Sequence, residues 1–159
     1  LLHPDNENQP FPMIMTGPES AEPYFRQIDE FVRATLGADA QRRYEIIIDN
    51  PREVARQMKQ GLQEVLQFRK RHGDAYYFNW SLTIDHEFQQ PFVATHEAMR
   101  DLVINEGLPT HKLAANLRRA FSGIVSGNVR EDTAEIIERE GPFEINGSGR
   151  IMGLMDEFP

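Results

Sequence analysis

Residues 44 to 54 read YEIIIDNPREV, an apolar strand pattern followed directly by a helix-start pattern. Positions 46–48 are three consecutive isoleucines, and an unbroken apolar run is typical of a strand buried on both faces of a parallel sheet. Asn50 followed by Pro51 indicates a helix start, with a side-chain cap and a proline at the first helical position. A buried strand that passes directly into a helix predicts half of a strand–helix–strand–helix unit.

The preceding residues predict the other half of that unit. PFPMIMTGP at 10–18 is a second continuous apolar run and predicts another buried strand. Ser20 is expected to cap a helix over about 22–36, and Gly37 supplies its stop. The helix that follows the isoleucine strand is expected to end in the basic residues 69–71. We therefore predict a βαβα unit whose sheet is parallel, with a right-handed crossover.

The sequence pattern changes after Gly73. The aromatic stretch DAYYFNWSLTI, residues 74–84, has a strand-like composition. Three helices are then expected: one from Thr95 to about Asn105, one from Thr110 to about Gly127-Asn128, and EDTAEIIERE capped by Asp132. The apolar stripe of the long helix is expected at Leu113, Leu117, Phe121, Ile124 and Val125. GPFEINGSG predicts a short strand and an Asn-Gly turn.

Composition excludes several classes of protein. The chain has 159 residues, a formal net charge of −8 and no cysteine. An acidic chain argues against broad binding to nucleic acid or to anionic membranes. The lack of cysteine excludes disulfides and thiolate metal sites and fits a cytoplasmic setting. No apolar run approaches the roughly 20 residues of a membrane span, and no signal peptide is recognisable.

Both ends of the chain have the pattern of interrupted helices. LLHPDN at the start resembles the last turn of a helix that runs into a proline-stopped loop. IMGLMDEF near the end has the apolar spacing of a helix that has barely begun. We therefore expect a fragment of a longer protein.

The end of the first predicted strand is the first candidate site. In open α/β sheets, ligands bind outside the carboxyl ends of the strands. The Thr16 hydroxyl can donate to a phosphate or a sugar, and Gly17 lets a ligand approach the backbone. The alternative is a plain strand-to-helix turn, which is common.

LRRAFSGIVSGN, residues 117–128, is the second candidate site. Arg118, Ser122 and Ser126 form one stripe of the predicted helix, and Arg119, Gly123 and Gly127 form the next. An interior glycine costs a helix about 1 kcal/mol, so a close approach of a ligand or a backbone is expected. The two arginines and Ser122 can grip a phosphate. The alternative is a tight helix–helix contact, or a subunit seam between copies of the chain, with both arginines in salt bridges.

FRKRHGDAYYFNW, residues 68–80, combines positive charge with aromatic rings. Arg69, Lys70 and Arg71 fall at a predicted helix end, where cations complement the helix dipole. That role explains them without a ligand, and the four rings (Tyr76, Tyr77, Phe78 and Trp80) are then core. The alternative is a site in which the three cations hold the phosphates of a nucleotide and a ring stacks on its base.

Metal and cofactor motifs are missing from the sequence. Asp85-His86-Glu87 and His96-Glu97 contain metal-ligand residue types but lack the HExxH and facial-triad spacings. The sequence also contains no GxGxxG, Walker A or GxSxG motif. No metal and no cofactor are therefore assigned.

Five stretches together resemble the C-terminal half of the bacterial pyrimidine/purine nucleotide 5′-monophosphate nucleosidases, which contain a Lonely-guy type, lysine-decarboxylase-like domain. They are LLHPDNENQPFPMIMTGPESAEPYFRQIDEFV, IIIDNPREVARQMK, GDAYYFNWS, LRRAFSGIVSGNV and GPFEING. The resemblance implies an α/β fold in which residues 1–72 are the C-terminal βαβα part of a Rossmann-like sheet. It implies that residues 73–159 form a smaller, mainly helical α+β domain peculiar to the family.

The resemblance also implies an activity. Such enzymes hydrolyse the N-glycosidic bond of nucleoside monophosphates without a cofactor, as homo-oligomers, here a dimer or tetramer, and guanosine tetra- or pentaphosphate regulates characterised members. On this chain, Thr16, Gly17, Arg118, Arg119 and Ser122 would contact the substrate, and Arg69, Lys70 and Arg71 the effector. The family signature PGGxGTxxE, whose glycines cradle the phosphate and whose glutamate assists cleavage, is absent from these residues. We therefore expect no catalytic residue here and no activity from this chain alone; a regulatory and oligomerisation module is the alternative.

Overall fold

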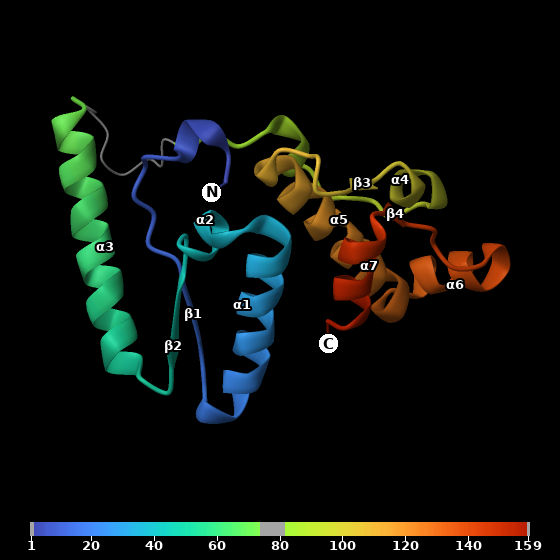
Figure 1. Ribbon diagram of the computed structural model, residues 1–159, viewed down its shortest axis with the longest axis horizontal. Coiled ribbons are helices and arrows are strands. Elements are labelled where there is room, and N and C mark those ends of the chain that lie inside the picture. The colour runs from blue at the N-terminus through green and yellow to red at the C-terminus, as the bar shows by residue number, and fades with distance from the viewer. Residues whose placement is uncertain (1, 74–81, 159) are drawn as a thin grey trace. The chain divides into compact units, whose positions relative to one another are not determined.

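The chain forms two compact units. The computed structural model describes residues 2–73 and 82–158 (Figure 1). One unit comprises residues 1–83 with 158–159, and the other comprises residues 84–157. This division lies beyond the predicted domain boundary after residue 72, and the division into domains of residues 1–72 and 73–159 stays a prediction. The predicted ring cluster of Tyr76, Tyr77, Phe78 and Trp80 lies outside the described residues.

The first unit is a two-stranded parallel sheet with helices. Its elements are η1 (Pro4–Asn6), β1 (Ile14–Gly17), η2 (Glu19–Ala21), α1 (Glu22–Leu36), α2 (Ala38–Gln41), β2 (Glu45–Ile48) and α3 (Pro51–Arg71). β1 pairs with β2 in parallel, from Ile14 opposite Glu45 to Gly17 opposite Ile48. The predicted order of strands and helices and the parallel pairing are therefore confirmed.

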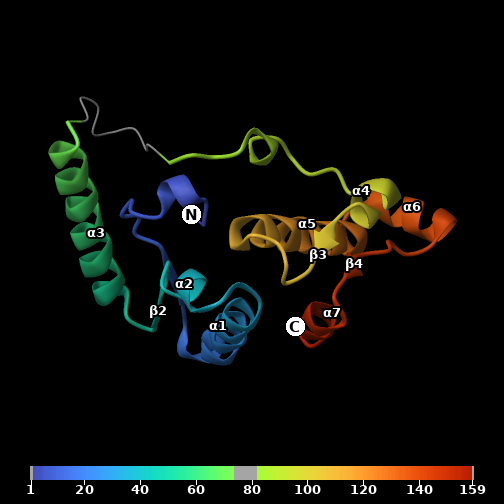
Figure 2. The same ribbon diagram turned by 45° about the horizontal axis from the view of Figure 1, so that its top comes forward.

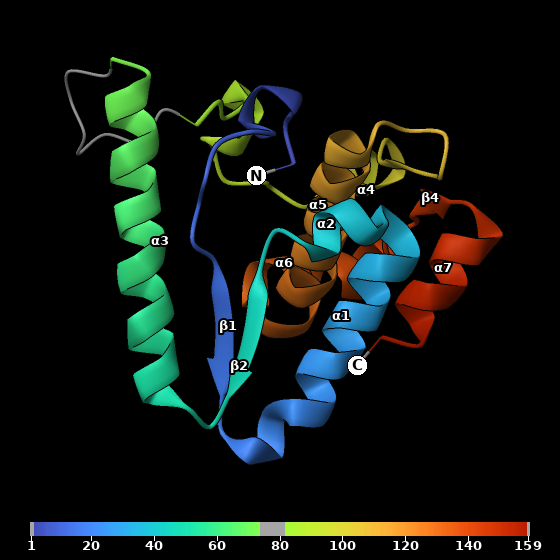
Figure 3. The ribbon, with the colours of Figure 1, turned by 60° about the vertical axis from the view of Figure 1, so that its left-hand side comes forward.

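The two long helices cover opposite sides of this sheet (Figure 3). On the α1 side, a Cβ added to Gly17 would lie 2.9 Å from Cε2 of Phe25, so the helix packs directly against the strand backbone. On the α3 side, a Cβ added to Gly61 would lie 2.5 Å from Cβ of Pro12. These two glycines allow each helix to approach the segment that carries β1.

The strands are less buried than their apolar sequences predicted. Thr16 and Glu45 are exposed, and the other residues of β1 and β2 are half-buried. The expectation of strands buried on both faces is therefore wrong for the described chain. Each face is covered by a single helix, and within residues 2–73 and 82–158 no third strand joins this sheet to shield its edges.

The helix ends follow the sequence signals with one exception. Asn50 accepts a hydrogen bond from the backbone N–H of Glu53 (3.1 Å) and caps α3 as predicted. Gly37 ends α1 with a φ of 86°, a conformation that favours glycine. Ser20 does not cap α1, because it lies inside the 3₁₀ turn η2, and Ala21 occupies the capping position without a side-chain bond.

Asp29 on α1 accepts two hydrogen bonds from the segment that leads into β2. The Tyr44 hydroxyl donates to Oδ1 of Asp29 (2.8 Å), and the Gln41 amide donates to Oδ2 (2.6 Å). Burial, followed by the hydrogen bond and the charge of Asp29, raises the pKa of Tyr44 above its ordinary value. The folded state therefore favours the neutral phenol.

The substitution Tyr44→Phe is expected to lower the free energy of unfolding at pH 7 by about 1–2 kcal/mol, because it removes the bond to Asp29. Since folding raises the Tyr44 pKa, this contribution is present below about pH 10 and lost at higher pH. Denaturant melts at pH 7 and at about pH 11 measure both effects, with Tyr24→Phe at an exposed tyrosine as the control. An equal deficit of Tyr44→Phe at both pH values would contradict this prediction.

The second unit is mainly helical (Figure 2). Its elements are η3 (His86–Phe88), α4 (His96–Arg100), β3 (Val103–Ile104), α5 (Thr110–Val129), α6 (Glu131–Glu140), β4 (Asn146–Gly147) and α7 (Gly149–Asp156). β3 and β4 pair in parallel. The bond from Ser148 N–H to the Ile104 carbonyl (2.8 Å) extends this short ladder.

Several predictions for the second unit are wrong in detail. The Asn-Gly pair at 146–147 is a strand instead of a turn, because it pairs with β3. The helix capped by Thr95 ends at Arg100, where the chain turns into β3. Asp132 lies in the first turn of α6, where Arg130 occupies the capping position without a side-chain bond, and residues 82–84 form no strand.

The core of the second unit is built around α5. Its buried apolar residues are Met99, Leu102, Ile104, Leu113, Ala115, Leu117, Ala120, Ile151 and Met155. In the second half of α5 the glycine stripe faces inward: a Cβ added to Gly123 would lie 2.3 Å from Sδ of Met99, and one added to Gly127 would lie 2.6 Å from Cδ1 of Ile137. The predicted apolar stripe is therefore wrong at Ile124 and Val125, which are 40% and 56% exposed.

The small stripe of α5 thus serves contacts within the chain. Gly123 meets α4 and Gly127 meets α6. Ser126 shares a 3.0 Å hydrogen bond with Thr133 of α6. The tight helix–helix contact that was one alternative for this stripe is confirmed at Gly123 and Gly127, which are not available for a seam between copies. The salt bridges expected of the two arginines stay a prediction. No described helix is long and apolar enough to cross a membrane.

Candidate functional site

The carboxyl edge of the first sheet carries polar groups from both strands. Thr16 is exposed near the end of β1. Asp49 follows β2, and its backbone N–H donates to the Gly17 carbonyl (2.9 Å). Gly17 is close to Phe25, so its lack of a side chain is explained by helix packing, without a ligand. Asp49 is exposed and has a φ of 49°, and it is the only non-glycine residue with positive φ in the described chain.

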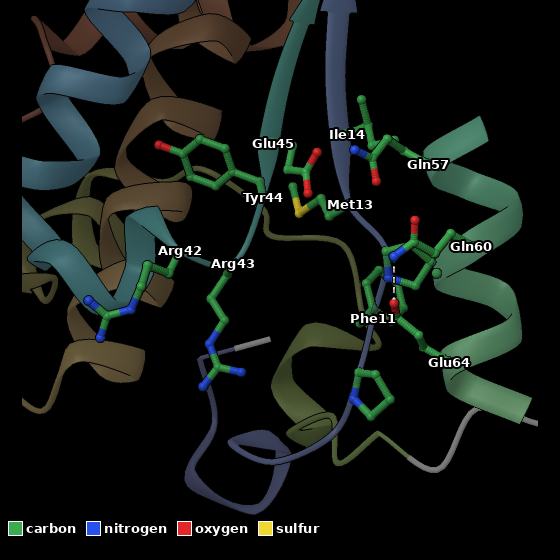
Figure 4. A pocket seen from close by; sticks show the side chains of 13 residues that line it. Phe11, Met13, Ile14, Arg42, Arg43, Tyr44, Glu45, Gln57, Gln60 and Glu64 are labelled. Atoms are coloured by element: carbon green, nitrogen blue, oxygen red, sulfur yellow. Dashed lines mark hydrogen bonds between the residues drawn. The ribbon is translucent and has the colours of Figure 1, made fainter. Parts of the chain in front are cut away.

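The amino end of the same sheet contains a cavity that the sequence did not predict. It has a volume of about 240 Å³. Its lining is Pro10, Phe11, Pro12, Met13, Ile14, Arg42, Arg43, Tyr44, Glu45, Gln57, Gln60, Gly61 and Glu64. Figure 4 shows that Gln57, Gln60 and Glu64 project from α3 toward the segment with Met13 and Ile14. Sequence reasoning missed it because its lining comes from the segments that lead into the two strands, from the first residue of each strand and from α3, and no motif marks these residues.

The predicted effector residues do not share one face of α3. Arg69 is only 5% exposed, whereas Lys70 and Arg71 are exposed. Consecutive helical residues point about 100° apart, which explains the division. Arg71 lines an open hollow of about 520 Å³ together with Glu7, Asn8, Gln9, Pro10, Glu64, Gln67 and Phe68.

The predicted substrate residues of α5 lie beside a hollow in the second unit. This hollow has a volume of about 600 Å³ and is lined by Phe92, Arg118, Phe121, Ser122, Val125, Ser126, Val129 and Arg130. Arg118 and Ser122 are therefore brought together. Arg119 does not line it; its guanidinium lies 5.3 Å from the ring centre of Phe88 and 5.9 Å from that of Phe92.

Cation–π contacts tie the arginines to the segment before α4. The Arg118 guanidinium lies 5.8 Å from the Phe88 ring centre, so Phe88 contacts both arginines. Such contacts orient a guanidinium without neutralising its charge. Sequence reasoning missed Phe88 and Phe92. The one signal that the sequence offered for them was their apolar character next to a charged segment.

The hollow beside Arg118 offers binding groups rather than acid–base groups. Arg130 forms an ion pair with Asp132 (2.9 Å), and the hydrogen bond from Arg130 is the main cause that lowers the pKa of Asp132. The lining residues that are described include no carboxylate and no histidine. Two cations, two hydroxyls and an aromatic wall suit an anion that carries an apolar or planar group.

The histidines and carboxylates do not gather into a metal site. Within the described ranges no group of three histidine, aspartate or glutamate residues is placed to hold a metal ion. His96 instead links α4 to the end of α6. Its Nε2 lies 2.9 Å from the Gly141 carbonyl, and its Nδ1 lies 3.7 Å from a Glu140 oxygen.

The sequence is similar to named proteins over nearly its whole length. A family model described as "Pyrimidine/purine nucleotide monophosphate nucleosidase, C-terminal" matches residues 62–158. Three relatives from Escherichia coli, of strains K12, O6:H1 and O157:H7, carry the name pyrimidine/purine nucleotide 5′-monophosphate nucleosidase. Each is 50% identical over 158 residues, which is 99% of this chain and 35% of the relative. The chain thus spans about a third of the length of these curated relatives.

Proposed function

This chain belongs to the family of the pyrimidine/purine nucleotide monophosphate nucleosidases, and on that premise we propose that the protein containing it hydrolyses the N-glycosidic bond of purine and pyrimidine nucleoside 5′-monophosphates. The products are ribose 5-phosphate and the free base. The observation that carries this proposal is the 50% identity over 99% of the chain to proteins of that name. The proposed setting is the cytoplasm, which the absence of cysteine favours.

The proposed reaction defines what an active site must supply. By analogy with glycosidases, cleavage passes through an oxocarbenium-like transition state, which needs a positioned carboxylate and a held substrate. In the proposed family mechanism, PGGxGTxxE supplies the phosphate cradle and the glutamate, and this motif is absent from these 159 residues. We therefore assign this chain binding roles and no catalytic residue.

Two separate surfaces of the described chain support binding roles. The carboxyl edge of the first sheet offers the Thr16 hydroxyl and the backbone at Gly17, where open α/β sheets receive ligands. The hollow of the second unit offers Arg118 and Ser122, with Arg119 beside it on the ring of Phe88. All five residues are proposed as substrate contacts.

The assay that tests the proposal compares the full-length protein with this chain alone. The full-length protein is expected to release free base from AMP, GMP or UMP, detected by chromatography. The isolated chain is expected to release none, because it lacks the signature glutamate. If the full-length protein releases no base from any of the three, the proposed activity is wrong. Base release by the isolated chain would instead show that catalytic groups lie within these residues.

A regulatory role for the end of α3 is the second proposal. Lys70 and Arg71 are exposed, and Arg71 borders an open hollow, which suits an anionic effector such as guanosine tetra- or pentaphosphate. Arg69 shares this proposed role, but its burial makes alanine there a test of folding as well. Calorimetry of the full-length homo-oligomer therefore uses Lys70→Ala with Arg71→Ala, and unchanged affinity for guanosine tetraphosphate would remove both residues from such a site.

A further inference from the structure

We propose that Asp49 contacts the substrate, its carboxylate accepting hydrogen bonds from the ribose hydroxyls of the nucleoside monophosphate. This inference rests on the proposed nucleosidase function and adds a residue that recognises the sugar.

The position of Asp49 is at the edge of the sheet where ligands bind. Because β1 and β2 are parallel and in register, Gly17 and Ile48 end together, and Asp49 is the next residue of the second strand. The 2.9 Å bond from Asp49 N–H to the Gly17 carbonyl fixes its backbone beside the end of β1. Thr16, already proposed as a contact, lies on the same edge.

The backbone of Asp49 is in the left-handed conformation, which costs free energy for a residue that has a side chain. Its φ of 49° lies in the left-handed region, where glycine fits without strain and aspartate or asparagine fits better than other residues. Such outliers gather at ligand-binding positions, where the surrounding structure holds them. The Asp49 carboxylate is exposed and forms no hydrogen bond or ion pair with the rest of the described chain.

The chemistry of a carboxylate selects the part of the nucleotide that it meets. An ionised carboxylate only accepts hydrogen bonds and repels a phosphate, whereas neighbouring ribose hydroxyls donate two bonds. In dinucleotide-binding sheets an acidic residue accepts a bond from the ribose in this way. The alternative role of Asp49 is electrostatic, because a negative charge just before α3 interacts favourably with the positive end of the helix dipole and stabilises the helix.

The experiment measures how the full-length protein discriminates AMP from 2′-deoxy-AMP. The kcat/KM ratio for the two substrates is determined for the wild-type protein, Asp49→Asn and Asp49→Gly. The intrinsic lability of each glycosidic bond cancels when the ratios are compared between proteins. Asp39→Asn is the matched control, because Asp39 is an exposed aspartate before the amino end of β2 and, among the described residues, forms an ion pair only with Arg42.

The preference for AMP is expected to fall about tenfold in Asp49→Asn and about 10- to 100-fold in Asp49→Gly, since a hydrogen bond to a charged group is lost. Asp39→Asn is expected to keep the wild-type preference. Both Asp49 variants are expected to melt no lower than the wild type, because asparagine and glycine tolerate a positive φ.

An unchanged preference in both Asp49 variants would overturn the inference, whether or not their melting temperature falls. If the melting temperature falls while the preference for AMP is unchanged, the role of Asp49 is to stabilise α3 through its helix dipole. If the wild-type protein cleaves neither nucleotide, the proposed function itself fails, and this result is distinct because it appears before any variant is compared.

Discussion

The substitution Gly123→Leu is expected to lower the free energy of unfolding of the second unit by more than about 3 kcal/mol. A Cβ at this position would lie 2.3 Å from Sδ and 2.5 Å from Cε of Met99. The end of a methionine side chain can usually move aside, but Met99 is 0% exposed, so its displacement would disturb the core packed around it. Overpacking a filled core costs about 1–3 kcal/mol for small insertions, and leucine adds a whole side chain.

Denaturant unfolding measures this effect, and Ser122→Leu is the matched control on the same helix. Ser122 is exposed, so leucine there is expected to change the free energy of unfolding by no more than about 0.5 kcal/mol. Shortening the opposing side chain should also rescue part of the loss: Gly123→Ala with Met99→Ala is expected to be less destabilised than the sum of the single variants. A Gly123→Leu variant as stable as Ser122→Leu would contradict the contact with α4.

Asn6→Ala is expected to destabilise the first unit by about 2–4 kcal/mol. Asn6 is 2% exposed, and its amide makes two bonds to one residue far along the chain: Nδ2 donates to the Thr83 carbonyl and Oδ1 accepts from the Thr83 N–H, each at 2.8 Å. Alanine removes both partners at once. Each backbone group left without a partner costs about 1–3 kcal/mol, less where water reaches it.

Asn6→Asp separates the loss of the donor from the loss of the side chain. The ionised aspartate can still accept from the Thr83 N–H, but it faces the Thr83 carbonyl with a buried negative charge. Burial raises the pKa of this carboxyl in the folded state, so the stability of the variant should rise as the pH falls and the donor is restored. Asn8→Ala, at an exposed asparagine, is the control. Equal melting temperatures for Asn6→Ala and Asn8→Ala would contradict the prediction.

The first unit was predictable because local signals and tertiary structure agree there. Asn50, Pro51 and Gly37 define helix ends by their own backbone and capping preferences, and the structure confirms all three. The apolar runs identified the strands, but they carried no information on the number of neighbouring strands. Burial of β1 and β2 was therefore overestimated.

The second unit was less predictable because contacts far apart in the sequence decide its details. Asn146-Gly147 has the strongest local signal for a turn, yet pairing with Val103-Ile104 makes it a strand. The apolar residues Ile124 and Val125 predicted the buried side of α5, but close packing at Gly123 turns the glycine side inward. Apolar periodicity alone does not reveal that a glycine fits where a larger residue is excluded.

The candidate sites, too, were predictable only where their residues lie close together in the sequence. The small and cationic residues of α5 were predicted to gather, and Arg118 and Ser122 do line one hollow. The aromatic partner Phe88 could not be predicted, because it is about 30 residues earlier in the chain than the arginines that it contacts. Asp49 had no motif, and only its backbone conformation distinguishes it.

The pairing of β3 with β4 also determines when the second unit can fold during synthesis. Its first strand ends at Ile104, and the second begins at Asn146, so the ladder forms only after α5 and α6 have left the ribosome. Ile151 and Met155 complete the core still later. Until then the nascent chain exposes the apolar face of α5, and we expect chaperone binding or premature degradation to act on the protein at this stage of translation.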